Sequence, residues 1–286
     1  MKPESGKIGL IAGGGRFPVL FAREARRQGH EVVAVGVQGV TDPAIEREVG
    51  ELHLYKIGQL DAPIQAMKKA GVRQAIMAGK IQHGSIFRDL RPDLRAIKVL
   101  ARLRDKRADT ILKAVADEFA KDGIEFLPSA TYLSHLIAQP GVLTERAPDP
   151  VELQDVELGW KAAKAIAGMD VGQTAVVGNG MVVALEGLEG TDACIRRAAE
   201  LTKPETQAGH ALVVVKVAKP RQDLRFDLPV IGMETVKVLS ECRARVLAIE
   251  GGKNLVLDKE HVLAAMDLAG IAFIALDPRK MDPQPL

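Results

Sequence analysis

Short apolar runs alternate with amphipathic segments along the first half of the chain. The apolar runs have the length of buried strands, and the amphipathic segments place their apolar side chains at helical spacing. The expected strands cover residues 7–13, 31–37, 51–57 and 72–79, and the expected helices end at Gly29, Gly71 and Gly123. Strands that alternate with helices predict a parallel sheet covered on both faces, so we expect a Rossmann-like domain here.

The pattern changes near residue 139. The stretch 139–150 contains three prolines and no hydrophobic periodicity, which predicts a linker. Beyond it, two apolar runs flank a Gly-Asn-Gly turn at residues 178–180 and predict a hairpin, and further strands alternate with helices. We therefore expect an α/β fold with two domains. A Rossmann-like, nucleotide-binding parallel sheet would cover residues 1–138, and a mixed, catalytic α/β domain residues 151–286.

The composition narrows the classes of function. Aromatic residues make up 3% of the 286 residues and the net charge is +2, which argues against a nucleic-acid partner. Cys194 and Cys242 are far apart and lack metal-ligand spacing, as in proteins of a reducing compartment. Apolar runs stay below the roughly 18 residues that a membrane span needs. We therefore expect a cytoplasmic protein that meets a membrane only through its surface.

The first expected strand ends in Gly13, Gly14 and Gly15, directly before a helix. Backbone N–H groups at a helix N-terminus attract phosphate, so these glycines are candidate nucleotide ligands, although a tight turn needs the same small residues. Pro18 stands where the dinucleotide fingerprint has its third glycine. The second strand ends in residues 36–38 (GVQ), which lack the acid that holds a ribose. An NAD(P)-dependent oxidoreductase is therefore a disfavoured alternative.

Two further glycine-containing stretches carry candidate ligands. Lys80 follows a strand at the edge where open parallel sheets bind ligands, and its ammonium group would reach a phosphate unless it is simply solvated. Gly190 precedes a helix for which Thr191 or Asp192 would be the N-cap. A glycine at a helix start favours an anion site, a nearby acid would instead favour a metal, and a plain capped turn is the third interpretation.

The stretch KPRQDLRFDLPVIG, residues 219–232, is named the arginine motif below. Its period of two would place Asp223, Arg225 and Asp227 on one face of an extended strand. Prolines at both ends exclude a helix and the middle of a central strand. Two acids around an arginine on one face indicate that the face holds a further group, and a salt-bridged edge strand is the alternative.

Four stretches in this order resemble the LpxI family of UDP-2,3-diacylglucosamine pyrophosphatases: GLIAGGGRFP, AGKI, EGTDA and the arginine motif. The resemblance extends from about residue 10 to residue 276, and the arginine motif is its most specific part. It implies hydrolysis of UDP-2,3-diacylglucosamine to 2,3-diacylglucosamine 1-phosphate (lipid X) and UMP in lipid A biosynthesis. Water would attack the sugar-side phosphorus, with a divalent ion such as Mg²⁺.

The resemblance also implies roles for single residues. Asp227 matches the family's essential aspartate and is expected to be catalytic and a Mg²⁺ ligand, with Asp223 as a second ligand. Arg225 and Gln222 are expected to be catalytic, since a diphosphate needs its charge neutralised. The expected substrate-binding residues are Gly13, Gly14, Gly15, Lys80, Gly190, Thr191 and Asp192.

The acyl chains of such a substrate imply a protein that is peripheral to the inner membrane and faces the cytoplasm. We expect no nucleic-acid partner, and a homodimer is the candidate assembly. A nucleotide-sugar or lipid-binding protein without enzymatic activity is the remaining alternative, because it would bind the same ligand without turning it over.

Overall fold

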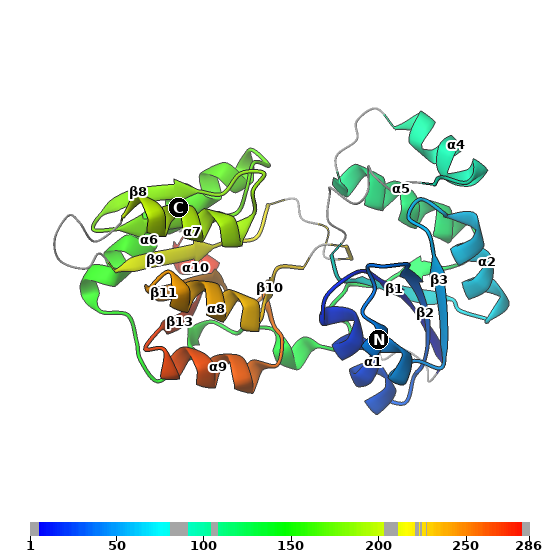
Figure 1. Cartoon of the computed structure of the whole chain (residues 1–286), viewed down its shortest axis with the longest axis horizontal. Helices are drawn as coiled ribbons and strands as arrows, with labels where there is room; N and C mark the ends of the chain where they lie inside the picture. The colour runs from blue at the N-terminus through cyan, green and yellow to red at the C-terminus, as the bar shows by residue number, and fades with distance from the viewer. Residues whose placement is uncertain are drawn as a thin grey trace. The chain divides into compact units, whose positions relative to one another are not determined.

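The computed structural model describes residues 6–80, 91–103, 108–202, 211–220, 223, 225–226 and 228–281 (Figure 1). The chain divides into two compact units. The first unit is Met1–Ser134 with Asp223–Leu228, and the second unit is His135–Gln222 with Pro229–Leu286. A short segment of the arginine motif therefore belongs to the first unit, although its neighbours in the sequence belong to the second.

The first unit contains a five-stranded sheet of order β3-β2-β1-β4-β5, in which all strands are parallel. Its elements are β1 (Lys7–Ala12), α1 (Phe17–Arg27), β2 (Glu31–Val37), η1 (Pro43–Arg47), β3 (Glu51–Tyr55), α2 (Asp61–Lys69), β4 (Gln74–Ala78), α4 (Leu94–Arg102), α5 (Ala108–Lys121), β5 (Glu125–Phe126) and η2 (Ser134–Leu136), which begins at the end of the unit. This strand order is that of one half of a doubly wound fold, whose ligands bind at the carboxyl ends of the strands.

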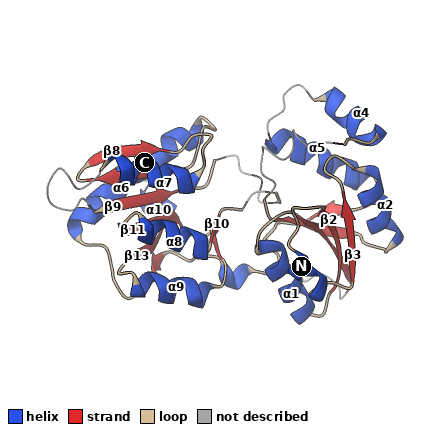
Figure 2. Cartoon of the chain, in the orientation of Figure 1, coloured by secondary structure: helices blue, strands red, loops and turns tan. Residues whose placement is uncertain are grey.

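The strand residues alternate between two packed faces of this sheet. Val33, Val35, Ala75 and Met77 pack on one face with side chains of α2, α4 and α5. The other face is covered by α1, which contacts β1 and β2 (Figure 2). Because both faces are covered, the strands are apolar along most of their length, and this pattern made them predictable.

The second unit contains a six-stranded sheet of order β6-β13-β11-β9-β7-β8 and a separate parallel pair, β10 and β12. Its elements are β6 (Gly141–Val142), α6 (Pro150–Gly168), β7 (Thr174–Gly178), β8 (Met181–Leu185), α7 (Thr191–Leu201), β9 (Leu212–Lys216), β10 (Val230–Ile231), α8 (Met233–Glu241), β11 (Ala244–Glu250), β12 (Leu255–Val256), α9 (Lys259–Leu268), β13 (Ala272–Leu276) and α10 (Pro278–Met281). Strands β9, β11 and β13 are parallel, while β6, β7 and β8 join the sheet antiparallel.

Two apolar layers cover this mixed sheet. Trp160 of α6 packs on one face with Val213 and Val215, and helices α7, α8 and α9 cover the other face (Figure 2). The predicted hairpin is confirmed as β7 and β8, with Asn179 and Gly180 at positive φ in its turn. The α/β fold class, with a parallel N-terminal sheet and a mixed C-terminal one, is confirmed as well.

The proline-rich stretch 139–150 is attached to the second unit rather than extended as a free linker. Residues 141–142 form β6, which pairs with β13, and the Phe273 N–H donates to the Thr144 hydroxyl at 2.8 Å. Asp149 caps α6, with Pro150 as the first helical residue. The prolines therefore fit an edge strand and a helix start. The predicted domain boundaries, at residues 138 and 151, stay a prediction.

None of the helices in the described part of the chain is long and apolar enough to cross a bilayer.

Candidate active site

The two glycine-containing loops of the first unit bind each other at the carboxyl ends of β1 and β4. The Gly13 N–H donates to the Ala78 carbonyl at 2.8 Å. Gly14 and Lys80 exchange backbone hydrogen bonds of 2.8 and 3.0 Å. The structure thus brings Gly13, Gly14 and Lys80 together, as a ligand site requires, and leaves Gly15 and Lys80 exposed.

This pairing changes the role that the glycines can have. The N–H groups of Gly13 and Gly14 donate to backbone carbonyls, so in this arrangement they shape the loop rather than cradle a phosphate. The substrate-binding role of Gly13, Gly14 and Gly15 stays a prediction, and in this arrangement the N–H groups of Gly13 and Gly14 already have backbone partners. Polar contact with a phosphate would come instead from exposed groups such as the Lys80 ammonium.

The end of β2 does not offer a dinucleotide site. A Cβ on Gly36 would lie 2.7 Å from the Thr41 hydroxyl, which donates to the Ala12 carbonyl at 2.6 Å. The Val37 N–H donates to the same hydroxyl at 2.8 Å. The Thr41 hydroxyl therefore links the ends of β1 and β2 by hydrogen bonds. In dinucleotide-binding proteins, an acidic side chain at this place holds the adenosine ribose.

Because the two loops approach each other closely, we expect Gly79→Ala to destabilise the fold more than Gly15→Ala does. Both Gly79 and Gly15 have positive φ. A residue with a Cβ loses about 1–2 kcal/mol of stability in this backbone conformation. A Cβ on Gly79 would lie 2.7 Å from the Gly14 carbonyl oxygen, whereas a Cβ on Gly15 has no atom within 4 Å. We expect Gly79→Ala to lower the free energy of unfolding by roughly 3 kcal/mol, because overpacking adds to the backbone strain. Gly15→Ala should cost about 1 kcal/mol.

Urea unfolding of the two variants, followed by circular dichroism, compares these costs. Equal losses of unfolding free energy would show that the loops separate easily, which contradicts the tight pairing.

The arginine motif forms a turn at the residues where the sequence predicted an extended strand. Arg225 and Phe226 lie in this turn, and the Phe226 N–H donates to the Asp223 carbonyl at 2.9 Å. The Asp223 carboxylate also accepts the Arg225 N–H at 3.1 Å. The strand prediction is wrong here because an aspartate that accepts a backbone N–H two residues ahead stabilises a turn.

The same carboxylate binds the arginine side chain. Arg225 donates through Nε to Asp223 Oδ1 at 2.9 Å and through Nη2 to Oδ2 at 2.6 Å, a bidentate pair. These hydrogen bonds lower the pKa of Asp223 and raise that of Arg225. Both groups are therefore charged at neutral pH, and the carboxylate fixes the direction of the guanidinium.

Two further contacts attach the turn to the first unit. The buried Ser129 hydroxyl lies 2.9 Å from both the Arg225 carbonyl and the Met77 carbonyl of β4. The Phe226 ring packs edge-on to Phe126, with ring centroids 6.2 Å apart. Arg225 is thus held beside the strand whose end carries Lys80, and two predicted phosphate ligands belong to one unit.

Asp227 and Gln222 lie outside the described residues, so their catalytic roles stay predictions. The described part of the motif offers one carboxylate for a metal, and both oxygens of Asp223 accept from Arg225. Among the described residues, no group of three ligand side chains could hold a metal ion. Residues 223, 225, 226 and 228 therefore do not by themselves form a Mg²⁺ site, and the metal-ligand role of Asp223 stays a prediction.

The remaining predicted ligands lie in the second unit, at the start of α7. The N-cap is Gly190, at a φ of +83°, so Thr191 and Asp192 are the first two helical residues. The prediction that one of them is the N-cap is wrong. Glycine takes this position because its backbone conformation favours a residue without a Cβ.

The Thr191 hydroxyl belongs to a polar cluster instead of capping the helix. Lys216 Nζ donates to Thr191 Oγ1 at 3.2 Å, and Thr191 Oγ1 donates to Glu186 Oε1 at 3.3 Å. Lys216 is only 7% exposed and ends β9. The Lys216 ammonium and the Glu186 carboxylate, both buried, thus contact the same Thr191 hydroxyl, and Asp192 beside it is exposed.

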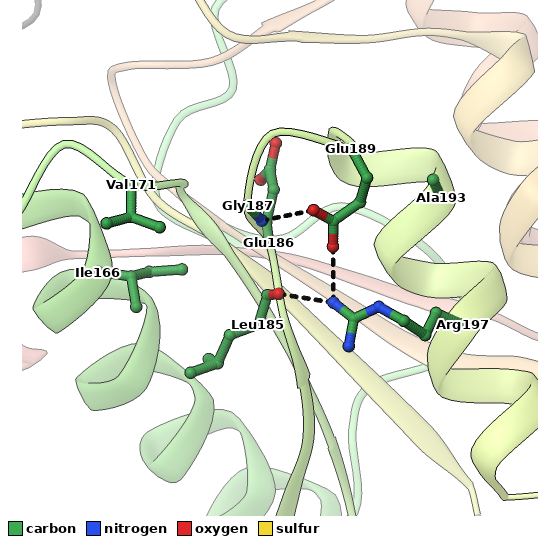
Figure 3. A pocket seen from close by; sticks show the side chains of 8 residues that line it. All are labelled: Ile166, Val171, Leu185, Glu186, Gly187, Glu189, Ala193 and Arg197. Carbon is green, nitrogen blue, oxygen red and sulfur yellow. Dashed lines mark hydrogen bonds and ion pairs between the residues drawn. The ribbon is translucent and has the colours of Figure 1, made fainter.

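A shallow cavity of about 540 Å³ adjoins this helix start (Figure 3). On one side of it, Glu189 accepts from Arg197 at 2.6 Å and from the Gly187 N–H at 3.0 Å. The Arg197 guanidinium also donates to the Leu185 carbonyl at 2.8 Å. The residues that line the cavity are Ile166, Val171, Leu185, Glu186, Gly187, Glu189, Ala193 and Arg197. The cavity is therefore apolar on one side and carries an ion pair on the other.

Sequence reasoning missed Ser129 and Lys216 as members of these sites. Lys216 could have been recognised from the sequence, because it is the single charged residue in the aliphatic run ALVVVKV. Ser129 could not have been recognised, because its two hydrogen-bond partners are 52 and 96 residues away in the sequence.

Comparisons with known proteins agree with the resemblance found in the sequence. The LpxI N-terminal domain family matches residues 7–136, and the LpxI C-terminal domain family matches residues 139–274. A Caulobacter vibrioides protein named UDP-2,3-diacylglucosamine pyrophosphatase LpxI is 34% identical over 281 residues, 96% of this chain and 99% of that protein. A solved structure described as "Crystal structure of gox2253" covers 96% of this chain and 90% of its own, at 11% identity and a TM-score of 0.31, too distant to support an argument. The two domain matches and the identity over nearly all of both chains show that the chain belongs to the LpxI family.

Proposed function

We propose that the protein hydrolyses the diphosphate of UDP-2,3-diacylglucosamine to lipid X and UMP. The observation that carries the proposal is the fixed arginine of the motif. Asp223 orients the Arg225 guanidinium, and Ser129 attaches the Arg225 carbonyl to β4, whose end carries Lys80. The name of the 34% identical relative supplies the substrate.

The chemistry of a diphosphate explains why such an arrangement is useful. Charge develops on the phosphoryl oxygens as the bond to the leaving phosphate breaks, and positioned cations stabilise it more than they stabilise the ground state. Arg225 and Lys80 would neutralise these oxygens. In the second unit, Gly190, Thr191 and Asp192 at the start of α7 stay candidate substrate ligands, and Lys216 holds the Thr191 hydroxyl in place.

The motif residues outside the described part complete the proposal. Asp227 would orient the attacking water or hold Mg²⁺, and Gln222 would donate to a phosphoryl oxygen. Water would attack the sugar-side phosphorus, and UMP would leave. A Mg²⁺ requirement comes from the family resemblance alone; the ion would neutralise phosphate charge.

The acyl chains of the substrate give the location that we propose. A lipid with two chains stays in the bilayer, so the enzyme would work at the cytoplasmic surface of the inner membrane as a peripheral protein. A homodimer remains the proposed assembly.

The test is incubation of the full chain with UDP-2,3-diacylglucosamine and Mg²⁺ in mixed micelles, with UMP measured by chromatography. We expect UMP and lipid X in equal amounts, loss of both on addition of EDTA, and recovery with excess Mg²⁺. Hydrolysis in ¹⁸O-water should place the label in lipid X. Label in UMP would refute attack at the sugar-side phosphorus, and tight binding of the substrate without hydrolysis would favour a binding protein.

A further inference from the structure

Helix α4 of the first unit has an outward face that combines apolar and cationic side chains. Its exposed residues are Leu94, Ile97, Lys98, Ala101 and Arg102, and these five are named the α4 face below. Because they are three and four residues apart, they share one side of the helix. Figure 1 shows α4 at the rim of the first unit, beside α5.

The opposite side of α4 is fixed to the unit. Ala96 and Val99 are buried in the core of this unit. The Asp93 carboxylate accepts the Ala96 N–H at 2.8 Å and caps the helix. It also accepts the N–H groups of Leu60 and Asp61, at 2.7 and 2.8 Å, at the start of α2. The orientation of α4 on the unit is therefore set by buried contacts and by a carboxylate that binds two helix starts.

The apolar part of the α4 face is a second apolar surface, which the core does not use. Leu94 is 77% exposed and Ile97 is 49% exposed, and Ala101 on the next turn is exposed as well. A single exposed apolar residue is ordinary, whereas a row of them on one side of a helix gains free energy when a further apolar surface covers it.

The cations of the α4 face differ from the neighbouring arginine of the same helix. Three carboxylates bind Arg95, at 2.6 to 3.2 Å, and neutralise it. By contrast, Lys98 and Arg102 form no ion pair with any residue that the structure describes. The α4 face also contains no acid. It is therefore complementary to a surface that is negatively charged and has an apolar layer beneath the charge.

We propose that the α4 face is the surface through which the protein binds a bilayer with anionic headgroups. Leu94 and Ile97 would enter the boundary between headgroups and acyl chains, and Lys98 and Arg102 would contact headgroup phosphates, as in interfacial helices. This inference rests on the proposed function, because it names the surface that would meet the membrane of the diacyl substrate.

The other possible occupants fit the α4 face less well. A second copy docked face to face would bring Lys98 and Arg102 close to the same two cations of its partner, with no acid of either face between them. A nucleic acid would match the cations but would leave Leu94 and Ile97 uncovered. A bilayer covers both kinds of side chain at once.

The test measures sedimentation of the full chain with vesicles made of equal parts of phosphatidylcholine and phosphatidylglycerol, without substrate or Mg²⁺. Vesicles of phosphatidylcholine alone are the comparison. We expect at least about 30-fold stronger binding to the anionic vesicles, because each cation near such a surface contributes about 5-fold. Most of this preference should disappear in about 1 M salt, which screens charges within about 3 Å. A wild-type protein that does not bind the anionic vesicles would refute the proposal.

Two double variants separate the cationic and the apolar contributions. Lys98→Gln with Arg102→Gln should weaken binding to the anionic vesicles about 30-fold. Leu94→Ser with Ile97→Ser should weaken it about 10-fold, because less apolar surface enters the bilayer. The four side chains are exposed, so the melting temperature of both variants should stay close to that of wild type.

Matched controls make the same changes elsewhere on the surface. Lys161→Gln with Lys237→Gln removes exposed cations from α6 and α8, and Leu201→Ser with Leu268→Ser changes exposed leucines at the ends of α7 and α9. Each control should keep binding within about 3-fold of wild type, because charges far from the lipid are screened. A control that loses as much binding as the corresponding α4 variant would overturn the proposal, as would α4 variants that bind like wild type.

Hydrolysis assays separate this inference from the proposed function. In neutral detergent micelles, both α4 variants should hydrolyse UDP-2,3-diacylglucosamine at the wild-type rate, whereas with substrate in limiting anionic vesicles they should be slower in proportion to the lost binding. If the wild-type protein hydrolyses no substrate in micelles, the proposed function fails, and vesicle binding still decides the role of the α4 face. Sedimentation equilibrium that shows a wild-type dimer and monomeric α4 variants would assign this face to a second copy and refute the membrane contact.

Discussion

Asp227→Asn is expected to reduce the turnover of UDP-2,3-diacylglucosamine by about 10²–10³-fold, the usual cost of losing one preorganised electrostatic group. The residue matches the essential aspartate of the family in the arginine motif, and an amide has neither the charge that binds a metal nor the basicity that orients water. Asparagine has nearly the same shape, so folding should be unaffected. The measurement is UMP release at saturating substrate, with the melting temperature recorded for each protein.

Asp277→Asn is the control for this substitution. Asp277 is an aspartate outside the motif, and its carboxylate accepts hydrogen bonds from the Arg279 guanidinium. Its variant should keep wild-type turnover. A folded Asp227→Asn protein with wild-type kcat would remove Asp227 from the mechanism.

The parallel sheet of the first unit could be predicted because its pattern is local. Strands covered on both faces are short apolar runs, and the helices α1, α2 and α5 are each followed by a glycine. Gly29 and Gly71 both have positive φ, a conformation that favours glycine after a helix.

The candidate site was predicted less well, because hydrogen bonds between side chains and backbone leave little trace in a hydrophobic pattern. The alternation in residues 223–228 suggested a strand, but the Asp223 carboxylate accepts the Arg225 N–H and closes a turn. Phe226 still packs against the core, as an apolar residue would in a strand or in a turn. A period of two was therefore informative about burial and misleading about backbone conformation.

Long-range partners account for the rest of what sequence reasoning missed. Glu250 accepts from Ala218, 32 residues away, and from Lys164, 86 residues away. Its place at the end of an apolar strand resembles that of Lys216 on β9. A lone charge at the carboxyl end of a buried parallel strand marks a candidate for a structural or functional ion pair, although the partner is visible only in the fold.

Arg225→Lys is expected to lower kcat by about 10²-fold, although the charge is unchanged. The guanidinium binds Asp223 through two parallel hydrogen bonds, at 2.9 and 2.6 Å, and lies 4.7 Å from the centre of the Phe226 ring. An ammonium group is a point charge that cannot form this fork, so the cation would lose its fixed direction toward the phosphates.

Arg279→Lys is the matched control for Arg225→Lys, because Arg279 forms the same bidentate pair with an aspartate two residues before it, at 3.1 and 2.9 Å. Both substitutions weaken a local ion pair by a similar amount, and surface pairs of this kind contribute about 0–1 kcal/mol to stability. Similar melting temperatures with a selective loss of kcat in Arg225→Lys would therefore assign the loss to chemistry rather than to folding. Equal kcat values for the two variants would show that Arg225 only stabilises its turn, and the proposed contact with the diphosphate would have to be abandoned.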